Sequence, residues 1–347
     1  MSDLLFFDST LRDGSHAIKH TLTPENIRDY CRMVDEAGLH TVIVGHGNGL
    51  GASSLQVGLS LLDDREMLRI ARENLQHTRL GTLLIPGFGT IHDDIIPAIE
   101  EGADLFCVAA HCTEADVTRQ HIEFISRKDK EVYGILMMYH MAPRERILEE
   151  ARKMQSYGAK GVIIMDSAGA STPELVQETI STLTDELDVA IGFHSHNNIG
   201  LGVSNAYTAI KAGASIIDGT IRGFGAGAGN CQLEALEALL RMEGIETGLN
   251  LYKMLDASDE VVRNFSDKSF GIEPLSIISG MTGVFSAFAT QVRRAAEQYN
   301  VDPRDIFVEL GKRKVVGGQE DLVLDVALNL AQRQEEDETS YLLESLL

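Results

Sequence analysis

Two histidines separated by one residue follow a run that is typical of a β-strand. The run 188–193 leads directly into His194, Ser195 and His196. Because alternate side chains of an extended chain leave on the same side, His194 and His196 should project together. Two imidazoles on one face suit a divalent metal ion. The same pattern also occurs on ordinary exposed strands, so a metal site needs a third ligand from elsewhere in the chain.

A loop near the N-terminus offers that third ligand. It follows the apolar run 4–7 and contains Arg12, Asp13 and His16. Asp13 with the two later histidines makes a mixed oxygen and nitrogen set that suits Mn²⁺, with Mg²⁺, Co²⁺ or Zn²⁺ as alternatives. An ion with open coordination positions could bind a 2-oxo acid and stabilise its enolate. In such a reaction Arg12 would hold the developing oxyanion, and His16 would carry the proton.

An alternation of strand and helix patterns predicts how these residues meet. Apolar runs at 4–7, 41–44, 80–84, 105–109, 132–138, 161–165, 188–193 and 215–219 predict strands. Helical patterns separate and follow these strands, at 24–37, 63–75, 92–101, 114–127, 143–157 and 232–242. Two further helices are predicted, one that begins at 173 and one that ends at 212. Eight such units predict an α/β fold, a TIM (β/α)8 barrel, with a doubly wound sheet as the alternative.

Polar residues gather where the predicted strands end. Beyond the ligand candidates, we expect a supporting or substrate-contacting role for residues at these positions, namely Asp8, His46, His111, His140 and Asn230. Barrel enzymes keep their chemistry at the carboxyl ends of their strands. Histidines after several different strands are difficult to explain by core packing, because each buried imidazole needs a partner.

The last hundred residues lose the alternation. Helical patterns at 251–264, 284–299, 303–311 and 322–333 predict a small helical domain. We therefore expect a catalytic barrel over residues 1–248 and a helical C-terminal domain over residues 249–347, which would dock a partner.

Composition excludes several functional classes. The chain has 347 residues with 44% hydrophobic residues and a net charge of −22, so nucleic acid and anionic membrane surfaces are not expected partners. The four cysteines show no metal-type spacing, which indicates reduced thiols in a cytoplasmic protein. We expect neither a signal peptide nor a membrane-spanning segment.

The loop that holds Arg12 and Asp13 carries a family resemblance. Residues 10–14, TLRDG, resemble the signature of a family of metal-dependent barrel lyases and synthases that includes hydroxymethylglutaryl-CoA lyase and the isopropylmalate and homocitrate synthases. Further runs at 12–20, 110–116, 225–230 and 316–321 resemble the 4-hydroxy-2-oxovalerate aldolase branch over nearly the whole chain. This resemblance implies a class II aldolase that reversibly cleaves a 4-hydroxy-2-oxo acid to pyruvate and an aldehyde through a pyruvate enolate.

The resemblance also implies roles for individual residues. It assigns the metal to Asp13 and the two histidines, enolate stabilisation to Arg12, and the general base to His16. It adds Ser167 as a contact of the pyruvate carboxylate, and substrate contacts from His194 and Phe285. It further implies that the C-terminal helices contact an acylating aldehyde dehydrogenase or a second copy of the chain.

Four positions depart from that family pattern. Phe285 stands where the family has a tyrosine, Tyr139 where a small serine is expected, and Ile43 and Asn48 where acidic residues are expected. The pyruvate half of the site is therefore predicted to be intact, whereas the half that receives the aldehyde differs. The identity of the aldehyde stays open.

Other functions remain as alternatives. A Claisen-type condensation or lyase reaction involving an acyl-CoA, as in the related synthases, is one, and a non-catalytic partner protein is another. A Schiff-base aldolase would need a lysine inside the barrel, but Lys160 precedes its strand. The glycines at 223–229 alternate without forming GxGxxG, so we expect a tight turn near the substrate rather than a nucleotide site.

Overall fold

The structure is a computed structural model that describes residues 4–265 and 271–345. Parallel strands in sequence order form a closed barrel, namely β1 Leu5–Asp8, β2 Thr41–Ile43, β3 Arg79–Leu84, β4 Leu105–His111, β5 Glu131–Met137, β6 Gly161–Asp166, β7 Ala190–Ser195 and β8 Ile216–Gly219. The barrel closes where β1 pairs with β8, from Leu5 opposite Ile216 to Asp8 opposite Gly219. The predicted TIM barrel is confirmed, and the doubly wound alternative is wrong because the sheet has no open edge.

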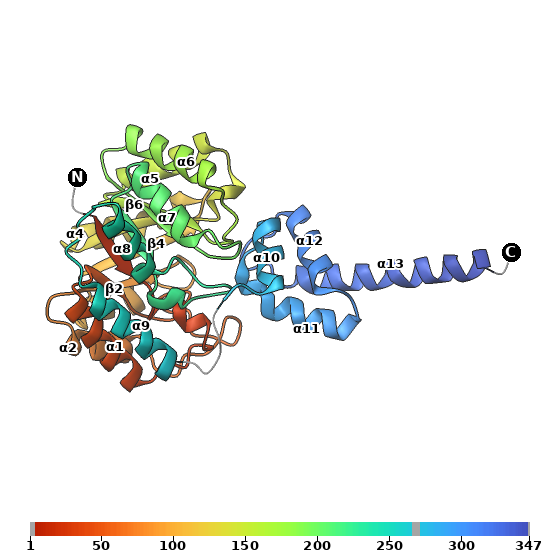
Figure 1. Ribbon diagram of the computed structural model, residues 1–347, viewed down its shortest axis with the longest axis horizontal. Coiled ribbons are helices and arrows are strands. Elements are labelled where there is room, and N and C mark those ends of the chain that lie inside the picture. Colours follow the sequence, from red (N-terminus) through yellow and green to blue (C-terminus); the bar gives the residue numbers. More distant parts are fainter. Residues whose placement is uncertain (1–3, 266–270, 346–347) are drawn as a thin grey trace.

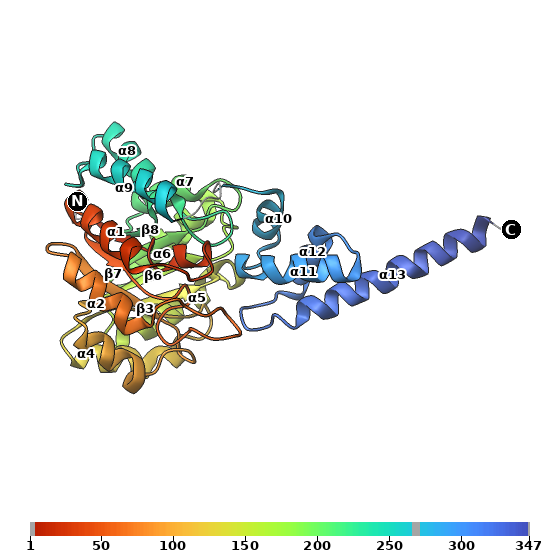
Figure 2. The same ribbon diagram turned by 90° about the horizontal axis from the view of Figure 1, so that it is seen from below.

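Helices surround the barrel (Figure 1, Figure 2). They are α1 Pro24–Ala37, α2 Asp64–Asn74, α3 Ile96–Glu100, α4 Arg119–Arg127, α5 Arg144–Ser156, α6 Pro173–Glu186, α7 Gly202–Lys211 and α8 Leu233–Met242. The start of α1 shows how local sequence sets these bounds: Thr23 and Asn26 form a reciprocal capping box. Gly38 ends the helix with a φ of 77°, in the left-handed region that favours glycine.

Alternation along the strands divides the apolar residues into two layers. Phe7, Ile43 and Ile163 belong to the cluster inside the barrel, whereas Phe6 and Val42 belong to the larger cluster that lies between strands and helices. This follows from the two-residue period of a strand, because neighbouring side chains point to opposite faces. The filled interior leaves the rim of the barrel as the place for chemistry.

Helix α9, Leu251–Asn264, packs on the barrel. The N–H of Asn250 donates to the carbonyl of Ala37 at 2.9 Å, and Met254 and Val261 are buried in the same cluster as the barrel helices. A separate apolar cluster begins only with the later helices. The division of the chain after residue 248 stays a prediction, and the packing groups α9 with the barrel.

The C-terminal helices form a smaller group with its own core. They are α10 Pro274–Thr282, α11 Ala289–Tyr299, α12 Pro303–Arg313 and α13 Leu322–Ser345. Helix α10 was not predicted, because its serines and glycine are weak helix formers that obscure the pattern. Its core includes Phe288, Phe307 and Leu310, and α13 extends away from the rest of the molecule (Figure 1, Figure 2).

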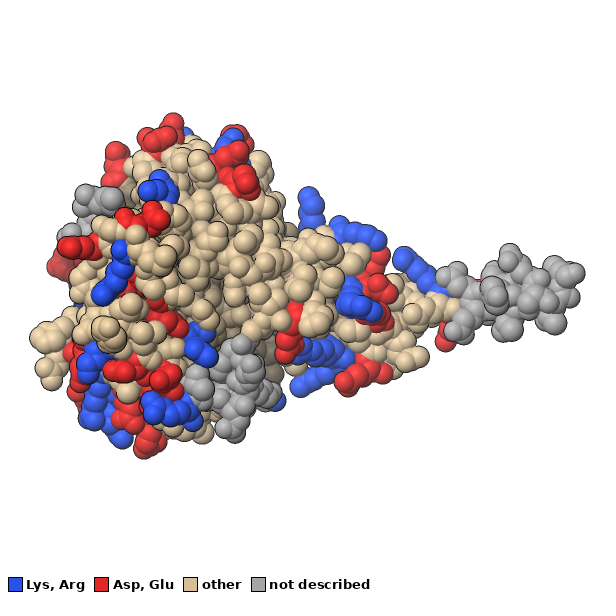
Figure 3. All heavy atoms as spheres, viewed as in Figure 1, with Lys and Arg blue, Asp and Glu red and all other residues tan. Residues whose placement is uncertain are grey.

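Charged side chains of both signs cover the visible outer parts of the barrel, whereas few are visible around its junction with the helical group (Figure 3). All four cysteines are buried and free. Within residues 4–265 and 271–345, no helix combines the length and the apolarity that crossing a bilayer requires.

Candidate metal and substrate site

The structure brings Asp13, His194 and His196 together at the C-terminal rim of the barrel. One potential ligand atom from each lies within 4.8 Å of the others. The Nε2 atoms of the two histidines are 3.4 Å apart, and His196 Nε2 lies 3.9 Å from Asp13 Oδ2. All three residues are buried, with 3%, 0% and 3% of their surface exposed. Loop residues after β1 and the end of β7 therefore converge, as the sequence predicts.

The surroundings of His194 fit a metal ligand. Its Nδ1 lies 3.2 Å from Asp218 Oδ2, which favours a proton on Nδ1 and leaves the Nε2 lone pair directed into the cluster. The amide of Asn230 lies 2.9 Å from this Nε2. Asn230 Oδ1 is buried and has no hydrogen-bond partner among the described residues. Two imidazoles, a carboxylate and an unpaired amide oxygen are a donor set that suits a divalent transition metal.

Asp13 is held as a carboxylate. Arg12 Nη1 donates to its Oδ1 at 2.9 Å, and the N–H of Ala226 donates to its Oδ2 at 3.4 Å. Burial by itself raises the pKa of Asp13, but the Arg12 guanidinium and then the nearby histidines hold the pKa well below its usual range. The cluster therefore contains a negative charge at neutral pH, as a cation site requires.

The glycine loop after β8 closes over this carboxylate. A side chain at Gly225 would place its Cβ 1.6 Å from Asn230 Oδ1 and 2.7 Å from Asp13 Oδ2. Only glycine allows the backbone to approach so closely. The alternating glycines predicted to form a tight turn near the substrate thus line the candidate metal site.

Arg12 and His16 lie beside the cluster. Arg12 also donates to the carbonyl of Gly47 at 3.4 Å and to Ser9 Oγ at 3.3 Å, while its Nε lacks a hydrogen-bond partner in the described chain. Burial lowers the pKa of His16 to about 4, against the opposing effect of Asp13. His16 is therefore neutral at physiological pH and can accept a proton.

Asp8 has a structural environment. It accepts hydrogen bonds from the N–H and hydroxyl of Thr10 and, at 2.7 Å, from the hydroxyl of Tyr30. Burial raises its pKa to about 6 in spite of these bonds. The Thr10 hydroxyl in turn accepts from the N–H of Ile221 at 2.9 Å. Asp8 therefore anchors the loop after β1 against the loop after β8.

The remaining predicted histidines occupy different places around the rim. His46 Nε2 lies 3.1 Å from the carbonyl of Gly58, and His111 Nδ1 lies 3.0 Å from Thr113 Oγ1. His140 Nε2 lies 3.1 Å from the carbonyl of Gly283, so this residue joins the barrel to the helical group. None of these interactions involves Asp13 or the histidine pair.

Ser167 follows β6 at the same rim. Its Oγ accepts a hydrogen bond from the N–H of Met138 at 3.2 Å, and Met138 has a left-handed φ of 56°. Because this bond uses an oxygen lone pair, the hydroxyl proton of Ser167 stays available for another acceptor.

The four departures from the family pattern are spread through the structure. Phe285 packs, partly buried, against the core of the helical group. Tyr139 is buried in the outer layer with its ring 6.3 Å from that of Phe193. Ile43 belongs to the barrel interior, and the N–H of Asn48 donates to His46 Nδ1 at 3.0 Å.

Sequence reasoning missed two residues that support the site. Asp218 lies within β8, and a carboxylate inside an otherwise apolar strand was the available signal. Asn198, two residues after His196, donates to Ser286 Oγ at 2.8 Å and Ser279 Oγ at 3.3 Å. Its contacts belong to the unpredicted helix α10 and the turn after it, so the sequence held no signal for them.

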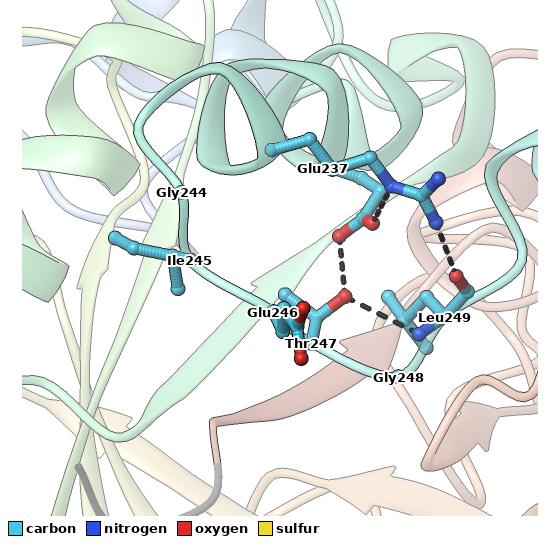
Figure 4. Close-up of a pocket in the computed structure, with 8 residues that line it drawn as sticks. Glu237, Gly244, Ile245, Glu246, Thr247, Gly248 and Leu249 are labelled. Carbon is cyan, nitrogen blue, oxygen red and sulfur yellow. Dashed lines mark hydrogen bonds and ion pairs between the residues drawn. The ribbon is translucent and has the colours of Figure 1, made fainter.

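A surface hollow of about 480 Å³ at the opposite end of α8 has no part in this site (Figure 4). Glu237 is fully buried there and accepts from Arg241 Nε and Thr247 Oγ1, both at 2.6 Å. Arg241 also donates to the carbonyl of Leu249 at 2.5 Å. These polar groups are paired with each other, so they fix the connection between α8 and α9.

Comparison with known proteins identifies the family to which the chain belongs. Residues 3–261 match the HMGL-like family, and residues 270–332 match the DmpG-like communication domain. The chain is 55% identical to the 4-hydroxy-2-oxovalerate aldolase of Pectobacterium atrosepticum, covering 96% of this chain and 97% of the relative. It is 52% identical to 4-hydroxy-2-oxovalerate aldolase 2 of Salinispora arenicola, covering 93% of each.

A solved structure confirms the fold at much lower sequence similarity. The carboxyl transferase domain of Rhizobium etli pyruvate carboxylase, solved with pyruvate, is similar with a TM-score of 0.77 and 18% identity. The match covers 96% of this chain and 61% of that chain. With two sequence relatives above half identity over nearly their whole length, the chain belongs to the HMGL-like family and, within it, to the 4-hydroxy-2-oxovalerate aldolases, which are carbon–carbon lyases.

Proposed function

We propose that the barrel reversibly cleaves a 4-hydroxy-2-oxo acid to pyruvate and an aldehyde with the help of a divalent metal ion. The observation that carries this proposal is the buried cluster of Asp13, His194 and His196. Arg12 and His16 lie beside it, and both are suited to enolate chemistry. The relatives named 4-hydroxy-2-oxovalerate aldolase support the same reaction class.

In this proposal Asp13, His194 and His196 hold the ion, and the side chains of Asp218 and Asn230 orient His194. A divalent ion in this site supplies a Lewis acid for the 2-oxo group of the substrate. We propose Mn²⁺ as the native ion, because the two imidazoles and one carboxylate suit it, with Mg²⁺, Co²⁺ and Zn²⁺ as the competitors to test.

Proton and electron movements are assigned to the side chains beside the cluster. Neutral His16 takes the proton from the C4 hydroxyl, the C3–C4 bond breaks, and its electron pair moves toward the C2 oxygen as the aldehyde leaves. Arg12, which already donates to Asp13, holds the negative charge that develops on the enolate oxygen. The proton that His16 took from the C4 hydroxyl is then returned to C3 of the enolate, which yields pyruvate and leaves His16 neutral.

Ser167, His194 and Phe285 complete the proposed substrate contacts. The hydroxyl of Ser167 accepts from a backbone N–H, so its proton can be donated to the carboxylate of pyruvate. Phe285 offers an apolar ring without a hydroxyl, which favours an aldehyde with an alkyl substituent over one that needs a hydrogen bond. A series of aldehydes of increasing chain length, condensed with pyruvate, tests this preference.

The reaction is tested by pyruvate release from 4-hydroxy-2-oxovalerate before and after EDTA. We expect activity to disappear with the chelator and to return on addition of Mn²⁺, with the other three ions compared in parallel. The exposed surface variant His92→Ala serves as a matched control. Activity that persists in EDTA contradicts the proposal, and release of thiol from an acyl-CoA supports the Claisen-type alternative instead.

We also propose that the helical group contacts an aldehyde dehydrogenase, which receives the aldehyde product. The match of residues 270–332 to a communication domain supports this partner. Exposed apolar side chains on α10 and α13, including Met281 at 66% and Leu324 at 49%, would be covered in the complex. The free, buried cysteines support the prediction of a cytoplasmic location.

Light scattering of the chain alone and after co-expression with the dehydrogenase tests the partner. Met281→Glu should weaken the complex, whereas Leu55→Glu, on an exposed barrel loop, serves as the control. Assembly of the chain with itself alone would favour a second copy as the partner, and a lone monomer under both conditions contradicts the proposal.

A further inference from the structure

Two stacked histidines join the loop after β1 to the loop after β2. The rings of His20 and His46 have centroids 3.7 Å apart and lie within 17° of parallel. His46 is fully buried and His20 is 7% exposed. Neither residue belongs to the proposed metal ligands or to the groups that exchange protons with substrate, so the pair needs another explanation.

The hydrogen bonds of this pair go to the backbone. His46 Nε2 donates to the carbonyl of Gly58 at 3.1 Å, while its Nδ1 accepts from the N–H of Asn48 at 3.0 Å. His20 Nδ1 accepts from the N–H of Gly47 at 3.4 Å. Each ring therefore has an unprotonated Nδ1 that accepts a backbone hydrogen bond, and both rings fix the conformation of the loop after β2.

The backbone is strained where it presents His20. Lys19 and His20 have φ values of 54° and 61°, a left-handed conformation that residues with side chains seldom adopt. Hydrogen bonds hold this turn: the N–H of His20 donates to the carbonyl of Ser15 at 2.7 Å, and the N–H of Leu61 donates to the carbonyl of His20 at 2.9 Å. Such strain persists only where the surrounding structure maintains it, and it is frequent at functional sites.

Gly47 connects the stacked pair to the catalytic residues. Its N–H is bonded to His20, and its carbonyl accepts from Arg12 Nη1 at 3.4 Å. A Cβ at Gly47 would lie 2.4 Å from His16 Nε2, so the backbone at this position lies directly against the imidazole of His16. One residue therefore contacts His20, Arg12 and His16 at the same time.

We propose that His20, supported by its stack with His46, is a positioning residue that acts through Gly47 on His16 and Arg12. The assignment rests on the proposed roles of those two residues in the aldolase reaction. His20 fixes the amide of Gly47, Gly47 limits the position of the His16 ring, and its carbonyl orients the Arg12 guanidinium. A small displacement of reacting groups is sufficient to reduce turnover strongly.

Kinetics of two His20 variants test the proposal. His20→Leu keeps a bulky side chain but removes the Nδ1 acceptor, and we expect kcat to fall by roughly tenfold to a hundredfold. His20→Asn offers its Oδ1 as the acceptor for Gly47 and should recover a large part of that loss. Pyruvate KM and the Mn²⁺ bound per chain should change less than twofold in both, and His92→Leu is the surface control.

A purely structural role predicts a different pattern. In that case Mn²⁺ content and folded fraction decline together with kcat, and His20→Asn is no better than His20→Leu; this result overturns the proposal. A His20→Leu kcat within twofold of the parent also overturns it.

Exchange of the Gly47 amide with deuterated water, measured by NMR, tests the link without any turnover. We expect exchange at least tenfold faster in His20→Leu than in the parent, with His20→Asn in between. Unchanged exchange overturns the proposal. This readout keeps the inference separate from the reaction, because a parent that shows no aldolase activity refutes the proposed function, while the Gly47 amide still reports whether His20 holds the loop.

Discussion

The two ends of the barrel use similar polar residues in opposite ways. At the N-terminal ends of the strands, Glu131 accepts from Arg79 at 2.5 Å, from Lys160 at 2.9 Å and from the hydroxyl of Tyr133 at 3.0 Å. Hydrogen-bond donors surround this carboxylate and compensate its negative charge. With all of these partners, Glu131 stabilises the fold.

At the C-terminal ends, Asp13 has a single cationic side-chain donor and faces two histidines whose Nε2 atoms point toward each other. Arg12 Nε and Asn230 Oδ1 are buried without partners in the described structure. Buried polar groups are normally satisfied, so incomplete pairing indicates a place that awaits a ligand. The difference between the ends teaches which polar residues stabilise the barrel and which await substrate and metal.

The largest expected effect comes from Asp13→Asn, at the C-terminal end of the barrel. Removing the charged ligand should lower kcat/KM by more than about a hundredfold, since loss of an outer partner alone lowers metal affinity or activity by 10–100-fold. The unfolding temperature in EDTA should also fall, because the variant leaves the buried Arg12 guanidinium without its counter-charge. Calorimetry in EDTA beside steady-state kinetics checks both. An unchanged unfolding temperature would mean that the Arg12–Asp13 pair does not contribute to stability.

Arg12→Lys should have the next largest effect. Lysine keeps the charge but lacks the planar fork that reaches Asp13, Gly47 and Ser9 together. We expect kcat to fall by roughly 10–100-fold, while Mn²⁺ binding, measured by titration calorimetry, changes little. Equal losses in metal affinity and kcat would instead show that Arg12 serves mainly to hold the carboxylate.

The pH dependence of kcat/KM should report His16. Burial lowers its pKa to about 4, so the neutral form that accepts a proton predominates above that pH. We expect a flat profile from pH 8 to about 5, followed by a decline of about tenfold per unit below 4. A decline that begins near 6.5, the ordinary value for histidine, would contradict this assignment.

Glu131→Gln, at the N-terminal end of the barrel, should leave kcat unchanged. It should reduce the free energy of unfolding by about 1–2 kcal/mol, as expected for lost hydrogen bonds to a charged, partly buried group. Although burial opposes ionisation, Lys160 and Arg79 lower the pKa of Glu131 to about 2. Its stabilising contribution is therefore complete above its unfolded value near 4.5 and disappears as the pH falls toward 2. Urea unfolding of parent and variant at pH 7 and pH 3 should show the difference shrinking.

Much of the site at the C-terminal end of the barrel could be predicted from the sequence, because its arrangement depends on local periodicity. Strand alternation placed His194 and His196 on one side, and the eight-unit repeat placed Asp13 at the same rim. Asp218 was missed because its partner, His194 on the neighbouring strand, is known only once the two strands are paired.

Contacts between distant segments could not be predicted. Helix α10 has a serine- and glycine-rich sequence whose helical state depends on packing, and with it the contacts of Asn198 and His140 were hidden. The contacts of Gly47 were hidden for the same reason, because three side chains meet at this one residue only after two loops fold together.

The pairing of β1 with β8 sets when the site can form during synthesis. A ribosome releases Asp13 early, but the histidines follow nearly two hundred residues later, and Asn230 later still. The first and last strands must meet before the three ligand side chains can share an ion. An incomplete chain therefore cannot bind the ion through all three ligands. An ion bound after folding would stabilise the closure of the barrel between its first and last strands.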